Sequence, residues 1–297
     1  MNRRNFIKQS VFLTGSLSVF GFAGNAFSAS FAKSSIKISL AEWSLHRALF
    51  SGKLDHLDFP REAKHKYGIK GVEYVNQFFK SAEKPYITEL KKRAEDNGVK
   101  SLLIMCDNEG SLGDPDEKKR IQTVENHYKW VEAAETLGCH SIRVNAASQG
   151  SYDEQMKLAS DGLHRLCLFA GERKINVIVE NHGGLSSNGQ WLTSVIKMAD
   201  HPRAGTLPDL GNFKISDTEL YDRYKGISEM LPYAKSVSAK SYDFDKEGNE
   251  TTIDFARVAE ILKKAGYKGY LGIEYEGDRL AEPEGIMATK KLIERFL

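Results

Sequence analysis

Carboxylates, amides and a lysine stand in this sequence directly after short runs of β-branched and apolar residues. A carboxylate is costly to bury unless it binds a cation, forms an ion pair or faces solvent. Several carboxylates that converge on one site repel one another unless a metal ion neutralises them. The residues that follow such runs, and could therefore share a site, are Glu42, Trp43, His46, Glu73, Asp107, Arg143, Asn145, Glu180, Asn181, His182, Asp209, Asn212, Lys240, Glu274 and Glu276.

The runs before these polar residues are predicted to be β-strands, and each is followed by a helical stretch. The clearest helical stretches are 128–137, 161–169 and 255–265. Strictly alternating strands and helices predict a parallel sheet, and eight such units in 297 residues predict an α/β fold closed into a single-domain (β/α)8 TIM barrel. The predicted strands are 36–40, 71–75, 102–106, 141–145, 176–180, 205–207, 235–239 and 270–274.

The predicted connections are short at one end of the barrel and long at the other. Glycines such as Gly68 follow the helical stretches and can adopt the left-handed C-cap, so the helix-to-strand turns need only about three residues. The strand-to-helix loops are longer, and such loops build the site in (β/α)8 barrels. Strand side chains alternate in direction, so Glu180, in phase with Ile178, could point into the barrel, as could Glu274, in phase with Gly272.

Three segments resemble strand motifs of a known family. Val177–Gly184, Leu207–Asn212 and Gly272–Gly277 are similar to the fifth-, sixth- and eighth-strand motifs of the xylose isomerase-like sugar isomerase/epimerase superfamily. The resemblance covers nearly the whole chain after residue 28. These motifs are moderately specific for the superfamily and only weakly so for a substrate, so the resemblance implies a barrel that acts on a small sugar without naming the sugar.

The resemblance also implies a metal site and an acid/base pair. In that family a divalent ion, often Mn²⁺ or Mg²⁺, is held by residues that correspond to Glu180, Asp209 and Glu274, and the two glutamates act as acid and base. The fourth family ligand is a histidine on the seventh strand, where this chain has Ser238, a poor substitute for imidazole. Three alternatives follow: carboxylates and water hold a hard cation, His182 completes the site, or no metal binds.

The remaining candidate residues are assigned to the substrate or to catalysis. His182 could be an acid or base or a donor to a hydroxyl, or it could pack against the Gly183-Gly184 turn. Lys240 could stabilise an enolate, form a Schiff base, or form an ion pair with Asp209 or Glu274. Polar contacts to the sugar are expected from Glu73, Asp107, Arg143, Asn145 and Asn212, and an apolar wall from Trp43 and His46.

The chemistry that these residues suit is removal of a proton next to a sugar carbonyl. A metal or Lys240 would stabilise the enediolate, while a base removes the proton and an acid returns it. We therefore predict a sugar isomerase or epimerase; the alternatives are a lyase or hydratase acting on 3-keto sugars or keto-glycosides, and a non-catalytic sugar-binding barrel. The superfamily's DNA-repair endonucleases fit poorly, because they need a histidine-rich multi-metal site and no histidine ends the third, fourth or seventh predicted strand.

The N-terminal segment is predicted to be an export signal. Arg3-Arg4 is followed by Asn5-Phe6-Ile7-Lys8, an uncharged stretch and small residues at 26–29, which resembles a twin-arginine signal. We expect removal of residues 1–28, a barrel domain over 29–297, and a periplasmic or otherwise exported protein with no stable membrane span. That compartment is oxidising, but three cysteines fit buried thiols better than a disulfide scaffold.

The charge of the chain argues against nucleic acid as a partner. Lys+Arg number 42 and Asp+Glu number 40, and removal of residues 1–28, which contain three basic residues and no acid, leaves 39 against 40. Nucleic-acid binding needs a basic surface that this balance does not supply. The expected partner is a small-molecule sugar, with self-association into a homo-oligomer as a further option.

Overall fold

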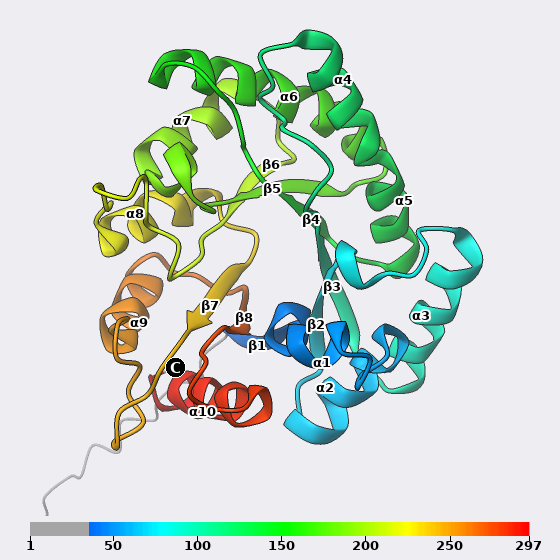
Figure 1. Ribbon diagram of the computed structural model, residues 1–297, viewed down its shortest axis with the longest axis vertical. Coiled ribbons are helices and arrows are strands. Elements are labelled where there is room, and N and C mark those ends of the chain that lie inside the picture. The colour runs from blue at the N-terminus through cyan, green and yellow to red at the C-terminus, as the bar shows by residue number, and fades with distance from the viewer. Residues whose placement is uncertain (1–35, 297) are drawn as a thin grey trace, which may run out of the picture. The chain divides into compact units, whose positions relative to one another are not determined.

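The computed structural model describes residues 36–296, and they form an α/β barrel (Figure 1). Eight parallel strands pair in the order β6-β5-β4-β3-β2-β1-β8-β7, which confirms the predicted TIM barrel. The predicted export signal lies outside the described residues. The strands are β1 (Lys37–Ala41), β2 (Gly71–Val75), β3 (Lys100–Met105), β4 (Ser141–Val144), β5 (Asn176–Glu180), β6 (Ala204–Leu207), β7 (Val237–Ser241) and β8 (Tyr270–Tyr275).

The two ends of the sheet, β6 and β7, meet through isolated bridges and not through a continuous ladder. One bridge joins Thr206 to Ala234 and the other joins Asp209 to Ser238. The amide of Ser238 donates to Pro208 O at 2.9 Å, and the amide of Leu210 donates to Ser238 O at 3.1 Å. The closure of the barrel therefore places Asp209 directly beside Ser238.

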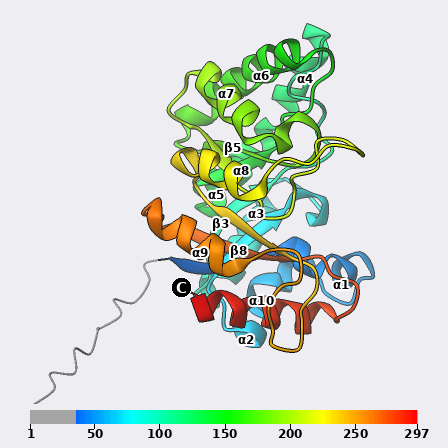
Figure 2. The ribbon, with the colours of Figure 1, turned by 90° about the vertical axis from the view of Figure 1, so that its left-hand side faces the viewer.

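The helices surround the strands, as Figure 1 shows, and Figure 2 gives the side view with α6 and α7 at one end and α2 and α10 at the other. The longest, α6, begins at a capping box in which Ser151 and Glu154 satisfy each other's backbone amides. The helices are α1 (His46–Phe50), α2 (Phe59–Tyr67), α3 (Lys84–Asp96), α4 (Glu117–Asn126), α5 (Tyr128–Leu137), α6 (Tyr152–Glu172), α7 (Gly189–Ala199), α8 (Arg223–Met230), α9 (Phe255–Lys264) and α10 (Glu282–Phe296).

The predicted asymmetry of the connections is confirmed. Three to five residues link a helical segment to the next strand, whereas six to fifteen residues link a strand to the next α-helix from β2 onward. Gly68 and Gly138 end α2 and α5 with φ of 70° and 75°, the left-handed conformation that glycine adopts without strain. The long loops therefore all lie at the carboxyl ends of the strands, and we call the opening there the mouth.

Two apolar clusters lie on opposite faces of the sheet. The larger fills the space between the strands and the helices. The smaller lies inside the barrel and is built mainly from β1, β2, β3, β5 and β6, with Trp43 packed against it. Buried polar side chains occupy the rest of the interior, among them Ser39, Glu73, Arg143, Glu180, Ser238, Lys240 and Glu274. The apolar residues of the inner cluster are Ala41, Val75, Phe78, Leu103, Met105, Ile178 and Leu207.

Strand β7 begins two residues later than predicted and therefore keeps the predicted side-chain phase. It spans Val237–Ser241 where 235–239 was expected, and so Ser238 and Lys240 both lie within the strand. The three cysteines are buried free thiols, as predicted. Within residues 36–296, no helix has the length and apolar character needed to cross a bilayer.

Candidate active site

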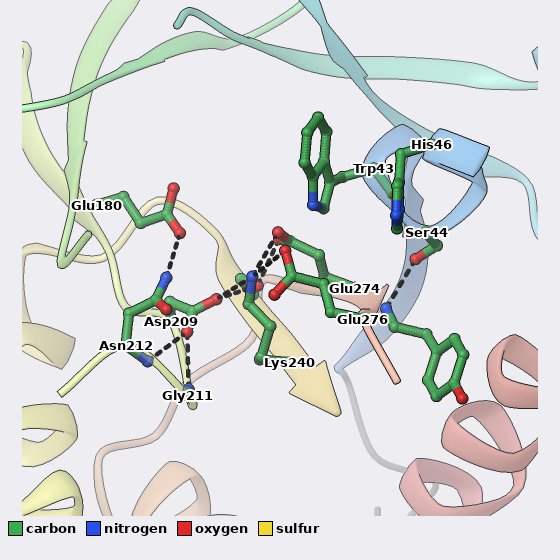
Figure 3. Close-up of polar contacts among 12 residues, drawn as sticks. Trp43, Ser44, His46, Glu180, Asp209, Gly211, Asn212, Lys240, Glu274 and Glu276 are labelled. Atoms are coloured by element: carbon green, nitrogen blue, oxygen red, sulfur yellow. Dashed lines mark hydrogen bonds and ion pairs between the residues drawn. The ribbon is translucent and has the colours of Figure 1, made fainter. Parts of the chain in front are cut away.

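Three carboxylates meet at the mouth, and we call Glu180, Asp209 and Glu274 the acidic triad (Figure 3). Glu180 ends β5, Asp209 follows β6, and Glu274 lies in β8. All three side chains are buried, and one oxygen of each lies within 4.8 Å of the others. The residues for which the resemblance implied a metal site are therefore brought together by the fold.

A turn after β6 fixes Asp209. Its Oδ1 accepts hydrogen bonds from the amides of Gly211 at 2.7 Å and Asn212 at 2.8 Å. The side chain of Asn212 in turn donates to Glu180 Oε1 at 3.2 Å (Figure 3). Asn212 therefore lies at the mouth as predicted, and it links two members of the triad.

The hydroxyl of Ser238 lies between the other two members. Its Oγ is 2.8 Å from Asp209 Oδ2 and 2.8 Å from Glu274 Oε2. A hydroxyl carries one proton, so it can donate to only one of these carboxylates at a time. The second oxygen–oxygen contact requires either a protonated carboxyl group or a nearby cation. This surplus of buried acceptors fits a hard divalent cation, which prefers carboxylate and hydroxyl oxygens.

Lys240 brings a positive charge to the triad. Its Nζ lies 2.7 Å from Glu274 Oε1, 3.1 Å from Glu276 Oε1 and 3.6 Å from Asp209 Oδ2. Burial alone lowers the pKa of Lys240, but the surrounding carboxylates outweigh it and raise that pKa well above its usual value. The ion-pair alternative for Lys240 therefore describes its geometry, and the surrounding carboxylates favour the charged amine over the neutral amine that a Schiff base requires.

Arg143 on β4 is the second buried cation of the mouth. Its Nε lies 2.8 Å from Glu180 Oε2, and its Nη1 lies 2.6 Å from Asp107 Oδ1. The side chain of Asn145 donates to the same Asp107 oxygen at 2.8 Å. The predicted substrate contacts Asp107, Arg143 and Asn145 therefore form one connected group, and that group holds Glu180.

The two glutamates of the triad have different electrostatic surroundings. Burial raises the pKa of Glu180 to about 8, because Arg143 offsets only part of the effect and the other triad carboxylates add to it. Burial also acts to raise the pKa of Glu274, but Lys240 and the Ser238 hydroxyl lower it below its usual value. In the metal-free protein Glu180 therefore holds a proton more readily than Glu274 does.

An aromatic wall borders the triad. The rings of Trp43 and His46 stack with centroids 5.0 Å apart, and Trp43 also contacts Phe50 and Phe78 with centroids 6.1 and 6.0 Å away. Figure 3 shows the Trp43 indole beside the space between Glu180 and Glu274. The predicted apolar wall therefore lies where the face of a sugar ring could pack on it.

The side chain of Glu73, a predicted substrate contact, lies inside the barrel and outside the acidic triad. Its side chain is fully buried inside the barrel, where Ser39 Oγ donates to its Oε1 at 2.7 Å and Ser236 Oγ at 3.2 Å. A β-carbon on Gly272 would lie 2.4 Å from the Glu73 carboxylate, so this glycine makes the room that the side chain occupies. Burial raises the pKa of Glu73 to about 7.

His182 reaches the mouth but not the triad. Its side chain is exposed, and its backbone amide donates to Ser186 Oγ at 3.0 Å. His182 is not among the residues whose ligand atoms lie within 4.8 Å of one another. Partial desolvation and the positive charge of Arg143 lower the pKa of His182, so its ring lies on the Arg143 side of the mouth, where a substrate could contact it.

Asn181, which directly follows β5, positions the triad. Its buried amide accepts from Asp209 N at 2.7 Å and donates to Asp209 O at 3.0 Å and to Asn212 O at 2.8 Å. Ser44 acts similarly on β8: its hydroxyl donates to Ile273 O and accepts from Tyr275 N, both at 2.9 Å. Local sequence carried no signal for these contacts, because their partners lie far away in the chain.

The chain is also similar to known proteins in part of its sequence. A segment of 54 residues is 41% identical to the C-glycoside deglycosidase alpha subunit of Arthrobacter globiformis, and 116 residues are 29% identical to the protein of the same description from Microbacterium trichothecenolyticum. These segments cover 18% and 37% of this chain. The chain spans only 15% and 31% of the length of those relatives.

Solved structures share the fold over almost the whole chain. D-psicose 3-epimerase from Clostridium cellulolyticum H10 aligns with a TM-score of 0.68 at 14% identity and covers 88% of this chain and 99% of its own. A 3-keto-D-glucoside 4-epimerase from E. coli aligns with a TM-score of 0.66 at 19% identity and covers 89% and 100%. The IolI protein, solved with a zinc atom, aligns with a TM-score of 0.67 at 14% identity and covers 88% and 99%.

The family model described as the xylose isomerase-like TIM barrel matches residues 61–296, which include seven of the eight strands and the complete acidic triad. This match agrees with the parallel barrel and with the three motifs at the ends of β5, β6 and β8. The chain therefore belongs to the xylose isomerase-like TIM-barrel family.

Proposed function

We propose that this protein is an enzyme that enolises a sugar, as an isomerase or epimerase, with Glu180 and Glu274 as its acid/base pair. The observation that carries the proposal is that the two glutamates share one buried site and that each has its own fixed cation. Arg143 lies 2.8 Å from Glu180, and Lys240 lies 2.7 Å from Glu274. Pairs of carboxyl groups held in different environments suit the acid and base roles of one reaction.

In the proposed reaction one glutamate removes the proton from the carbon beside the carbonyl and the other returns a proton. Return to the same carbon with inverted configuration gives an epimer, and return to the neighbouring carbon gives an isomer. Arg143 and Lys240 keep a compensating charge beside each carboxylate while its protonation changes. Trp43 would support the apolar face of the sugar ring.

We also propose a divalent cation as cofactor, held by the acidic triad with the Ser238 hydroxyl beside it. Such an ion supplies Lewis-acid stabilisation of negative charge on the substrate oxygens. The all-oxygen donor set favours Mg²⁺ or Mn²⁺ over softer metals. Elemental analysis of the purified protein tests this: a near-stoichiometric divalent ion supports the proposal, and loss of that ion from a Glu274→Gln, Asp209→Asn double variant assigns it to the triad.

A lyase or hydratase that acts on keto-glycosides is the second candidate. The similarity to C-glycoside deglycosidase subunits and to a 3-keto-D-glucoside epimerase favours it. The same enolate could expel a group at the neighbouring carbon instead of regaining its proton. Mass spectrometry separates the two reactions, because a lyase releases a leaving group from a 3-keto-glucoside and an epimerase conserves the mass.

The acid/base pair is tested by solvent exchange. The purified protein is incubated in D₂O with Mn²⁺ and either D-fructose or 3-keto-D-glucose, and deuterium at the substrate carbons is followed by NMR. Glu180→Gln and Glu274→Gln should each slow the exchange by roughly 10²-fold or more. Glu250→Gln is the matched control, since Glu250 is another buried carboxylate but hydrogen-bonds only within the β7–α9 loop.

Retained exchange in both triad variants would refute the acid/base assignment. Saturable sugar binding with no exchange and no change of mass would identify the non-catalytic sugar-binding alternative.

We further propose that residues 1–28 direct export through the twin-arginine route to the periplasm or beyond. The paired arginines in Arg3-Arg4-Asn5-Phe6-Ile7-Lys8 support this proposal. Replacing Arg3 and Arg4 with lysine should leave the protein in the cytoplasmic fraction. Unchanged fractionation of the variant would refute the export proposal.

A further inference from the structure

We infer that the site accepts an uncharged sugar or glycoside and discriminates against sugars that carry a phosphate or carboxylate. The inference rests on the proposed function and names the substrate class of the same site. It follows from the distribution of charge over the mouth and the two loops that border it.

Both buried cations of the mouth are already paired with carboxylates. Lys240 contacts Glu274 at 2.7 Å and Glu276 at 3.1 Å, and it is almost completely buried. Arg143 lies between Glu180 and Asp107, at 2.8 and 2.6 Å. An anionic group on the substrate would have to displace a buried carboxylate from either cation, which would leave that carboxylate unpaired at high cost.

The mouth has more acids than cations. The acidic triad with Glu276 and Asp107 supplies five carboxylates against the two cations Lys240 and Arg143. The two cations and a bound divalent ion together would carry four positive charges against these five carboxyl groups. The mouth therefore has no excess positive charge to attract an anion, whereas the hydroxyl groups of a neutral sugar can donate to the carboxylates.

The loops after β7 and β8 reinforce this selection. In (β/α)8 barrels that bind phosphate, the phosphate frequently sits on the loops after these two strands. Here the loop after β8 carries Glu276 and Asp278, and Glu282 begins α10. Arg47, which reaches this loop, lies 3.6 Å from both Asp278 and Glu282.

The loop after β7 is similar. Arg279 forms an ion pair with Asp243 on that loop and donates to the Phe244 carbonyl. Arg47 and Arg279 are thus held by acids and backbone carbonyls, so neither is a free donor for a phosphate on these loops.

Matched sugar pairs test the inference. With Mn²⁺ present, deuterium exchange is measured for D-fructose against D-fructose 6-phosphate and for 3-keto-D-glucose against its 6-phosphate. In whichever pair shows exchange, the neutral sugar should have a kcat/KM at least tenfold higher than that of the phosphorylated sugar. Equal rates, or a preference for the phosphate, would overturn the inference and leave the proposed function standing. Absence of exchange with all four sugars would refute the proposed function, and the inference with it.

A charge variant separates repulsion from simple steric exclusion. Glu276→Gln removes one acidic partner of Lys240 and should reduce the ratio of neutral to phosphorylated kcat/KM by several-fold. Glu132→Gln is the control, because Glu132 pairs with Arg173 on the outer helices at 3.1 Å. Asp278→Asn, at a fully exposed position beside Arg47, provides a second charge variant if Glu276→Gln is inactive. An unchanged ratio in every charge variant that retains activity would show that charge does not set the preference.

Discussion

Replacing Lys240 with methionine removes a buried charge while keeping a long, flexible side chain. The ammonium group lies among Glu274, Glu276 and Asp209, at 2.7, 3.1 and 3.6 Å. Removing one partner of a buried ion pair costs about 3–5 kcal/mol, because the remaining charge is left without compensation. At about 2–4 °C per kcal/mol for a domain of this size, the Tm of Lys240→Met should fall by roughly 6–20 °C in EDTA.

A divalent ion should recover part of this loss. An ion that binds only the folded state at a concentration of 100 Kd adds about 2.7 kcal/mol to stability. Because Lys240→Met has one more uncompensated carboxylate near the acidic triad, Mn²⁺ should raise its Tm by more than it raises that of the unmodified protein. Thermal unfolding with EDTA and with MnCl₂ measures both effects. Lys129→Met is the control. The amine of Lys129 is half-exposed and lies 3.2 Å from Glu109, and ion pairs near the surface contribute only about 0–1 kcal/mol to stability.

Two results would refute this reasoning. A Tm for Lys240→Met within 2 °C of the unmodified protein in EDTA, on the order of the shift that 1 kcal/mol produces, would mean that the carboxylates do not need the lysine. An equal or smaller Mn²⁺ shift in the variant would mean that the ion and the lysine do not compensate the same charges.

Three further outcomes are expected. Asn181→Ala removes three hydrogen bonds around Asp209 and should lower the affinity for Mn²⁺ measured by titration. The control Thr206→Val breaks one buried hydrogen bond on the outer face of β6 and should lower only the Tm. Equal Mn²⁺ affinities in the two variants would contradict the positioning role of Asn181. Ser238→His should shift competitive metal binding from Mg²⁺ toward Zn²⁺, because imidazole suits the later metals, and unchanged selectivity would place the metal elsewhere. For Glu73→Gln, the free energy of unfolding relative to the unmodified protein should rise by about 3 kcal/mol at most between pH 5 and pH 8, as measured by chemical denaturation. A difference that does not change with pH would contradict this prediction.

The sign of the Glu73 effect follows from its raised pKa. Burial lifts that pKa from near 4.5 in the unfolded chain to about 7 in the fold, so the folded state binds the proton more tightly. The unmodified protein therefore loses stability as the pH rises through this window, where the fold must hold a buried charge. Glutamine does not titrate, so the stability of the Glu73→Gln variant does not fall in this pH range.

Local patterns in the sequence determined the barrel and the edge at which its site lies. The strands were predictable because their β-branched runs alternate with helical stretches, and the helix ends were predictable because glycines such as Gly68 supply the left-handed C-cap. The inward direction of Glu180 and Glu274 followed from the two-residue period of a strand, which depends on no distant contact.

Only the tertiary structure decided which partner each polar side chain has. The sequence placed Glu73 at a strand end, as it did Glu180 and Glu274. In the fold, Gly272 of β8 leaves room for the carboxylate of Glu73, which is therefore buried inside the barrel. The sequence made Arg143 a candidate sugar contact, and the arrangement of β3, β4 and β5 sets that guanidinium between Asp107 and Glu180. Strand period fixes the direction of a side chain, whereas its partner depends on strand register and on how the barrel closes, and these arise from packing between segments far apart in the chain.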